Sequence, residues 1–410
     1  MVYRLSRLLT ARRITLHLVL LAACLWSLYA IDLATPGLRD RAGHLKGADF
    51  VHFYTGGYLA RTGGTQAIYD PPALAAAQQA LVPDSQGGYF VASYGPQVYL
   101  AFAPLTWLPY EWATIAWALM NGALYFFCCY ALWRTCPGLG PHPMVVFLAA
   151  LAFPGFFNLI AYGQTSGPAL VLFTLAFLAM RSRRMFLAGL AIGSLIYKPQ
   201  LGIAAAVVLL MAAEWRAVAG AIAAAAAQLA IAWRWFGGAA VEDYFHSLLR
   251  TGQALPFIEP RVYQMHSLRG FWLLLLPWRG VAFFIYVAMT IGVLALALRC
   301  WRSGAGLSLR YAALLFATVL AAPHLMVYDL VVLVPAFLLL ADWALEHAQA
   351  AASPALRVLL YLGYALPLLE MVAKYSRVQL SVVGFAALLI TVWSASREQT
   401  GALAASPGAV

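Results

Sequence analysis

Long apolar runs separated by short polar connections dominate the sequence. A helix needs about 20 mainly apolar residues to cross the hydrocarbon core of a membrane. Several runs are shorter than that, which is typical of tilted or re-entrant segments. The pattern therefore predicts an all-α polytopic membrane protein with about 12 transmembrane or re-entrant helices. The predicted helices lie at 14–31, 111–133, 143–162, 165–180, 185–197, 199–213, 217–235, 280–299, 311–323, 326–342, 356–372 and 378–395.

Two long polar segments, 32–96 and 237–279, interrupt the runs and are predicted to be loops on one side of the membrane. Within the first, the alanine- and glutamine-rich stretch 73–81 predicts a short surface helix. The stretch 97–109 is short and flanked by proline, so it predicts a re-entrant or interfacial helix. We expect a single transmembrane domain over 1–398 and a disordered tail over 399–410.

Composition supports the membrane assignment and excludes two other classes. Of 410 residues, 63% are hydrophobic and 10% charged, whereas soluble domains carry about 25% charged residues. The net charge of +11 is scattered between apolar runs, so we expect contact with membrane lipids and no nucleic acid. The five cysteines lie in or beside apolar runs without a CxxC pair, which predicts neither a disulfide framework nor a zinc site.

Arginine clusters predict the orientation. They precede the first run and occupy the connections "RSRR" (181–184) and "RCWRSGAGLSLR" (299–310). Because basic residues concentrate in cytoplasmic connections, we expect both termini in the cytoplasm and the two long loops outside. No small-residue cleavage site ends the first run, so it is predicted to be an uncleaved span. The expected location is the inner (plasma) membrane, with the active site on the periplasmic side.

Polar residues gather on the predicted outer side. Such groups are costly at membrane depth and usually line a cavity or a substrate path. Taken singly, each has a structural explanation: Asp49 could cap a surface helix or pair with Lys46, and Lys198 could snorkel to the interface. Their joint placement suits an anionic, lipid-linked substrate. The set comprises Asp49, His52, Tyr94, Gln164, Lys198, Arg261, His266, His324, Tyr328, Asp329, Lys374 and Arg377.

These residue types suit glycosyl transfer from a lipid phosphate. A departing phosphate carries negative charge, which cations stabilise, and a hydroxyl acceptor needs a base such as a carboxylate. Aromatic side chains can stack on sugar rings or on the lipid chain. Asp49 is the candidate base. The candidate phosphate ligands are Lys198, His324, Arg261 and His266, and the candidate substrate-binding residues are His52, Tyr54, Tyr94, Gln164 and Tyr328.

Five segments, in order along the chain, resemble glycosyltransferase family 87 of the GT-C superfamily, which includes polyprenyl-phosphate-mannose-dependent mannosyltransferases. The resemblance implies a GT-C fold with a catalytic acid in the loop after the first helix, which falls on Asp49. It also implies lipid-phosphate contacts at Lys198 and His324, with Gln164 nearby. The segments are "ADFVHFYTGGYLARTGGTQAIYD" (48–70), "YGPQVYLAFAPLTWLP" (94–109), "AYGQTSGPALVLFTLAF" (161–177), "AGLAIGSLIYKPQLG" (188–202) and "AAPHLMVYDLVVLVPAF" (321–337).

The sequence departs from the family pattern at two places. The family often has two prolines after the loop tyrosine, whereas Gly95 and Pro96 follow Tyr94 here. The serine common before the later histidine region is replaced by "PHLMVYD". A DxD motif is absent, so we expect metal-independent transfer without a cofactor.

The leading hypothesis is an integral-membrane glycosyltransferase. It would move a hexose, with mannose favoured by the resemblance, from a polyprenyl-phosphate donor to a lipid or glycan hydroxyl on the periplasmic face, with inversion and Asp49 as general base. The alternatives are a transporter or flippase for a lipid-linked or anionic substrate, and a non-catalytic scaffold subunit. Against transport, the polar residues favour one face over the midplane and no repeated pair of interrupted helices is found.

Overall fold

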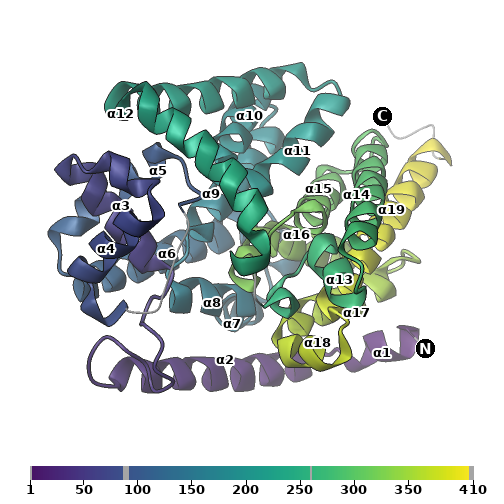
Figure 1. The fold of residues 1–410 in the computed structure, drawn as a ribbon. Helices are drawn as coiled ribbons and strands as arrows, with labels where there is room; N and C mark the ends of the chain where they lie inside the picture. Colours follow the sequence, from purple (N-terminus) through teal and green to yellow (C-terminus); the bar gives the residue numbers. More distant parts are fainter. Residues whose placement is uncertain (1, 86–91, 259–260, 406–410) are drawn as a thin grey trace.

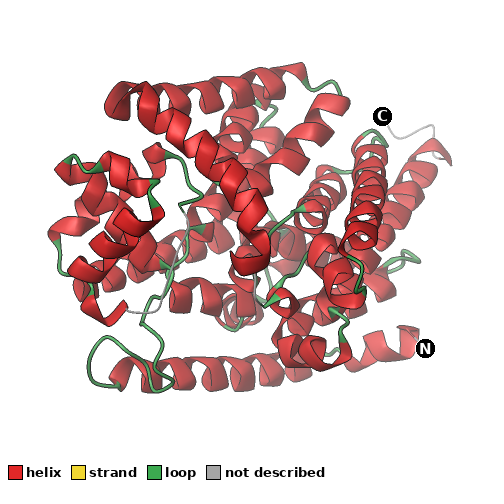
Figure 2. Cartoon of the chain, viewed as in Figure 1, coloured by secondary structure: helices red, strands yellow, loops and turns green. Residues whose placement is uncertain are grey.

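The computed structural model describes residues 2–85, 92–258 and 261–405, and in this part of the chain the regular elements are all helical (Figure 2). The predicted all-α class is confirmed. The α-helices are α1 (Val2–Leu8), α2 (Ala11–Ala34), α3 (Phe50–Thr62), α4 (Pro71–Leu81), α5 (Pro96–Phe102), α6 (Tyr110–Trp133), α7 (Pro143–Leu151), α8 (Pro154–Tyr162), α9 (Ser166–Arg181), α10 (Met185–Gly193), α11 (Pro199–Met211), α12 (Trp215–Ile258), α13 (Leu268–Leu275), α14 (Arg279–Trp301), α15 (Leu307–Ala321), α16 (Val334–Glu346), α17 (Ser353–Ala365), α18 (Glu370–Ser376) and α19 (Leu380–Ala405).

Short 3-10 helices connect or extend several of these elements. Those beside the polar residues of interest are η6 (Val262–Gln264) and η7 (Val327–Leu333). The others are η1 (Thr65–Ile68), η2 (Pro83–Ser85), η3 (Ala103–Trp107), η4 (Pro137–Leu139), η5 (Ser194–Tyr197) and η8 (Leu366–Leu369).

The described helices make this a polytopic membrane protein. Seven are long and apolar enough to cross a membrane, or eight if the bent pair α7–α8 is one span, and four apolar helices are shorter. Figure 1 shows the start of α1 and the end of α19 on the right of the molecule, whereas α3 and α4 lie on the left. The start of α1 lies at the lower right and the end of α19 at the upper right, and both are away from the segment that follows α2.

The predicted run 143–162 is broken in the middle. Pro154 begins α8, and the axes of α7 and α8 differ by 44°. Proline lacks the N–H that would continue the hydrogen-bond ladder, and its ring clashes with the preceding turn. The result is two short helices, and the second of them ends at the candidate site.

The segment 237–279, predicted as a long outer loop, is mostly helical, and no helix was predicted there. Helix α12 continues past Gly237, whose φ of 82° breaks the helical geometry, a conformation that glycine adopts readily. Beyond this kink, Tyr244 packs in a buried cluster with Tyr69 and Tyr99, and the Ser247 hydroxyl donates to the Ala92 carbonyl at 2.6 Å. This packing turns the second half of α12 back across the first polar segment (Figure 1).

Three short segments complete the comparison. Helix α4 covers the predicted helix at 73–81, although its Leu74 and Gln78 are buried. Helix α5 and η3 occupy the predicted short helix at 97–109. The predicted tail at 399–410 is helical as far as Ala405, because the alanine-rich end continues α19, and 406–410 lie outside the described residues.

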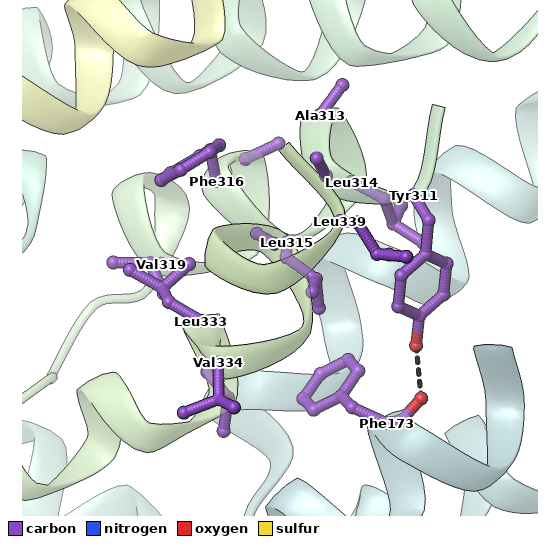
Figure 3. Close-up of a cluster of buried hydrophobic side chains, with 14 of the residues drawn as sticks. Phe173, Tyr311, Ala313, Leu314, Leu315, Phe316, Val319, Leu333, Val334 and Leu339 are labelled. Atoms are coloured by element: carbon purple, nitrogen blue, oxygen red, sulfur yellow. Dashed lines mark hydrogen bonds between the residues drawn. The ribbon is translucent and has the colours of Figure 1, made fainter. Parts of the chain in front are cut away.

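Helix α15 lies at the centre of the core. Every residue from Tyr311 to Ala321 is buried, as expected for a helix that is apolar on all faces. Figure 3 shows Phe316, Val319 and Leu333 in this cluster, with the Tyr311 hydroxyl donating to the Phe173 carbonyl of α9. This packing holds α9 and η7 together, and both carry polar residues of the candidate site.

Candidate active site

Asp49 lies directly before α3 and contacts the turn that follows α8. Its backbone N–H donates to the Tyr162 carbonyl at 3.0 Å, and its carboxylate Oδ2 accepts a 2.7 Å hydrogen bond from Gln164 Nε2. The side chain forms no capping bond to its own helix. Two segments that are 115 residues apart in sequence therefore meet at this carboxylate.

The ion pair with Lys46 that would make Asp49 a simple surface acid is not formed. The Lys46 ammonium donates instead to the carbonyl oxygens of Leu33, Thr35 and Gly37, at 3.1, 2.5 and 2.9 Å. Lys46 thus ties the loop back to the end of α2. Both structural explanations of Asp49, the side-chain cap and the pair with Lys46, are wrong.

The turn at Gly163 orients the Gln164 amide. Gly163 has φ 68°, and a Cβ there would lie 2.7 Å from the Cβ of Phe50, so both the backbone and the space require glycine. Trp117 Nε1 donates to the Gly163 carbonyl at 2.9 Å, and Asn121 Nδ2 donates to the Gln164 carbonyl at 3.1 Å. These bonds from α6 hold the backbone of Gln164.

The remaining amide atom is also fixed. The backbone N–H of Thr165 donates to Gln164 Oε1 at 3.2 Å. Because that oxygen is engaged on its own turn, the NH2 group points to Asp49. The carboxylate is therefore positioned by a preorganised donor.

Burial raises the pKa of Asp49 to about 6. The hydrogen bond from Gln164 and the charge of Lys198 counteract the rise, Asp329 adds to it, and His324 counteracts it further. The Asp49 side chain nevertheless keeps partial exposure, so a substrate can reach it. A carboxylate that is ionised at pH 7 but has a pKa near that pH suits a general base.

A second, fully buried polar cluster joins Lys198, Ser166 and Asp329. Lys198 Nζ lies 2.5 Å from Asp329 Oδ1 and donates to Ser166 Oγ at 2.8 Å, and the Ser166 hydroxyl donates to the same Oδ1 at 2.6 Å. Asp329 Oδ2 accepts from the Met326 N–H at 3.1 Å. The three side chains come from the starts of α11 and α9 and from η7, so this cluster joins three elements.

This pair changes how Lys198 can act. A buried ammonium with a carboxylate partner is largely neutralised before a substrate arrives. Its Nζ also lies 5.3 Å from the centre of the Tyr328 ring, which in turn packs 6.0 Å from the Tyr162 ring. The phosphate contact of Lys198 and the substrate contact of Tyr328 stay predictions.

Three predicted substrate-binding residues occupy different environments. The buried His52 shares a 2.8 Å hydrogen bond with the Tyr99 hydroxyl, and burial lowers the pKa of His52 to about 4, so the ring is neutral at pH 7. The Tyr54 hydroxyl donates to the Leu108 carbonyl at 2.8 Å. Tyr94 is partly exposed; burial raises its pKa, and the charges of Lys198 and Asp49 also act on it.

The predicted cations are also placed differently. His324 is partly exposed before η7, and its charge acts on Asp49. Arg261 is exposed at the start of η6. His266 is fully buried: its Nδ1 lies 2.7 Å from Ser381 Oγ, and its Nε2 lies 3.7 Å from Glu370 Oε1. The structure brings Gln164, Tyr94, Lys198 and His324 within electrostatic or hydrogen-bond reach of Asp49.

Sequence reasoning missed several supporting residues. Ser166 was not among the candidates, and Asp329 was counted among the outer polar residues without a proposed role. Trp117 and Asn121 lie inside an apolar run; their spacing of four residues places both on one helical face, which was the available signal. Among the described residues, no group of three or more His, Cys, Asp and Glu side chains is arranged to hold a metal ion.

Comparisons with known proteins support one assignment. The model of glycosyltransferase family 87 matches residues 90–327, a segment that contains Tyr94, Gln164, Lys198 and His324 and begins after Asp49. Neither a curated protein nor a solved structure matches the chain. The polytopic helical architecture agrees with the GT-C superfamily membership expected from this family. Because the match covers more than half of the sequence, the chain belongs to glycosyltransferase family 87.

Proposed function

We propose that this membrane glycosyltransferase transfers a hexose from a polyprenyl-phosphate donor to a lipid or glycan hydroxyl, with Asp49 as the general base. The observation that carries the proposal is the Asp49–Gln164 pair. The carboxylate is partly exposed and has a raised pKa. It accepts a hydrogen bond from the Gln164 amide, whose oxygen is in turn held by the Thr165 N–H. Lys198 and His324 act on it electrostatically.

The chemical step is a single displacement. The acceptor hydroxyl oxygen forms a bond to the anomeric carbon while its proton passes to Asp49. Because Gln164 engages Oδ2, we assign the proton to Oδ1. The bond between the anomeric carbon and the phosphate oxygen breaks, and its electron pair leaves with the phosphate. Attack opposite the leaving group inverts the anomeric configuration.

The donor phosphate is assigned to the cations around the site. His324 and Arg261 retain partial or full exposure, so both can meet a phosphate at the membrane surface. Lys198 contributes through the positive charge of its ammonium, which is held in the buried ion pair with Asp329. Buried His266 contributes by holding the segment before α13 against α18 and α19.

The sugar and the sidedness extend the same proposal. Mannose is favoured by the resemblance to polyprenyl-phosphate-mannose-dependent enzymes. The arginine clusters favour an inner-membrane protein with cytoplasmic termini and a periplasmic active site. Family membership disfavours the transporter and scaffold alternatives, because a glycosyltransferase family model matches residues 90–327.

The test uses the full-length protein reconstituted in vesicles with radiolabelled polyprenyl-phosphate mannose and a lipid extract as acceptor. Asp49→Asn keeps the size of the side chain and removes its basicity, so transfer should fall by about 10²–10⁴-fold. Asp84→Asn, an exposed acid in the same outer segment, is the matched control and should keep the wild-type rate. Transfer by Asp49→Asn at the wild-type rate would refute the assignment.

A further inference from the structure

A groove runs along the surface beside the candidate active site, between α2, α6 and α8. Its volume is about 490 Å³, within the range of ligand sites. Helix α8 packs against both α2 and α6 and forms the floor. The apolar walls include Trp26, Tyr29, Ile115, Leu119, Phe156 and Ile160.

The groove is apolar and opens to the membrane. Leu119 is 70% exposed and Ile115 47% exposed, and both lie on the candidate span α6. The Trp26 indole N–H donates to the Leu151 carbonyl at 2.9 Å, so this wall presents the ring and no unpaired donor. A hydrocarbon chain is the occupant that such a surface fits.

One end of the groove is lined by residues that flank the candidate site in sequence. Gly47, two residues before Asp49, lines it, and so does Ala161, which precedes the Gly163 turn. The Tyr110 hydroxyl donates to the Gly47 carbonyl at 3.0 Å and fixes this end. A chain lying in the groove would therefore carry its headgroup toward Asp49.

The charges at this end select the kind of headgroup. Asp32 and Asp40 line the rim, and Lys46 is the one cation among the described lining residues. The Lys46 ammonium is satisfied by three backbone carbonyls, and Arg41 outside the groove pairs with Asp32 at 2.9 Å. Asp40 Oδ1 accepts from the backbone N–H groups of Ala42 and His44, and its Oδ2 lies 3.6 Å from His44 Nδ1. Each charged lining residue in the described chain is thus engaged, which leaves no lining cation to bind a phosphate, whereas carboxylate oxygens can still accept from hydroxyl groups. The rim thus favours a neutral, hydroxyl-bearing headgroup.

We propose that this groove seats the hydrocarbon chain of a lipid acceptor whose neutral, hydroxyl-bearing headgroup lies at Asp49. The inference rests on the proposed function, because it takes Asp49 to be the base that meets the acceptor. The cations assigned to the donor phosphate, His324, Arg261 and Lys198, do not line the groove. Donor and acceptor therefore reach Asp49 along different surfaces.

The experiment is photo-crosslinking to the full-length protein in phosphatidylcholine vesicles. The probe is a monomannosyl diacylglycerol with a diazirine in one acyl chain, and a polyprenyl phosphate with a diazirine in its chain is the comparison. The glycolipid probe should label peptides of α2, α6 and α8. Excess unlabelled glycolipid should suppress that labelling, whereas unlabelled polyprenyl phosphate should not.

A pair of matched variants tests the position. A Cβ at Gly122, which lines the groove, would meet no atom within 4 Å, and the same holds for Gly292 on α14. Gly122→Leu adds an apolar side chain to the groove at a position with open space for its Cβ. It should lower the specific labelling roughly tenfold, because about two methylene groups of the lipid lose apolar contact. Gly292→Leu should leave the labelling unchanged.

Three outcomes would overturn the inference. They are labelling that unlabelled glycolipid does not suppress, displacement of the glycolipid by polyprenyl phosphate, and equal labelling of Gly122→Leu and wild type. The Asp49→Asn variant separates this inference from the proposed function. Its specific labelling should persist, since the groove is intact, whereas an unchanged transfer rate in that variant would refute the base and leave the groove result standing.

Discussion

Gln164 Nε2 donates a 2.7 Å hydrogen bond to Asp49 Oδ2, and this contact joins the loop after α2 to the turn after α8. The bond stabilises the ionised carboxylate and counteracts the rise in its pKa that burial causes. It also fixes one carboxylate oxygen, and in the proposed mechanism the other oxygen takes the proton of the acceptor. The predictions below follow from this arrangement and from the Lys198–Asp329 pair.

Replacing Gln164 by leucine should lower the transfer rate and shift its pH dependence. Without the amide donor the pKa of Asp49 should rise further, and the carboxylate loses its orientation, so kcat should fall about tenfold. The acid limb of the rate profile should move to higher pH. Gln66→Leu, an exposed glutamine in the same outer segment, is the control; an unshifted profile for Gln164→Leu would exclude the positioning role.

The wild-type rate should decrease as the pH falls through about 6. Asp49 accepts a proton only when it is ionised, and burial places its pKa at about 6. Initial rates of transfer between pH 4.5 and 8, at saturating donor, measure this limb. A rate that stays constant down to pH 4.5 would show that no group with this pKa acts as base.

Asp49→Asn should stabilise the protein at pH 7–8, although it slows transfer. The folded-state pKa of Asp49 lies above the unfolded value of 3.8, so its favourable contribution is complete below pH 3.8 and is lost as the pH rises through 6. At neutral pH the ionised carboxylate therefore costs stability, on the order of 1–2 kcal/mol after allowance for partial exposure. The thermal midpoint in detergent should rise at pH 8 and not at pH 4.

Breaking the buried pair should destabilise the protein, and removing both charges should restore it. Lys198→Met leaves Asp329 buried without its counter-ion, at a cost of about 3–5 kcal/mol. The double variant Lys198→Met/Asp329→Leu carries no buried charge and should recover most of the thermal midpoint.

The same double variant tests the role of Lys198 in the reaction. If the Lys198–Asp329 pair only joins three elements, the folded double variant should regain transfer. If the Lys198 ammonium also contacts phosphate, the double variant should fold and remain inactive. A single variant as stable as wild type would contradict the structural part of this account.

Gly163→Ala should be more harmful than Gly304→Ala. Both glycines have positive φ, at 68° and 74°, so alanine strains each backbone by about 1–2 kcal/mol. Only at Gly163 would the new Cβ also meet Phe50, at 2.7 Å. The difference between the two losses of thermal stability measures the cost of the contact with Phe50. Equal losses in the two variants would show that this contact has no cost. Transfer should fall in Gly163→Ala alone, because Gln164 moves with the turn.

Local sequence was enough to predict the membrane class and much of the helix pattern. Hydropathy is a sum over neighbouring residues, so the runs at 14–31 and 111–133 predict α2 and α6 closely. The same local view failed at Pro154 and over 237–258. At Pro154 a kink divides the predicted helix in two. Over 237–258 the helix is packed against aromatic residues that are distant in sequence.

The chemistry of the polar residues depends on contacts between distant segments, and only the tertiary structure decided it. From sequence, Asp49 and Lys46 are neighbours of opposite charge, yet the fold satisfies Lys46 with carbonyl oxygens and gives Asp49 to Gln164. Lys198 looks like an available cation until η7 brings Asp329 beside it. A buried polar group without a hydrogen-bond or ion-pair partner is costly. The sequence determined which polar groups the protein has, and the tertiary packing determined which of them pair with one another.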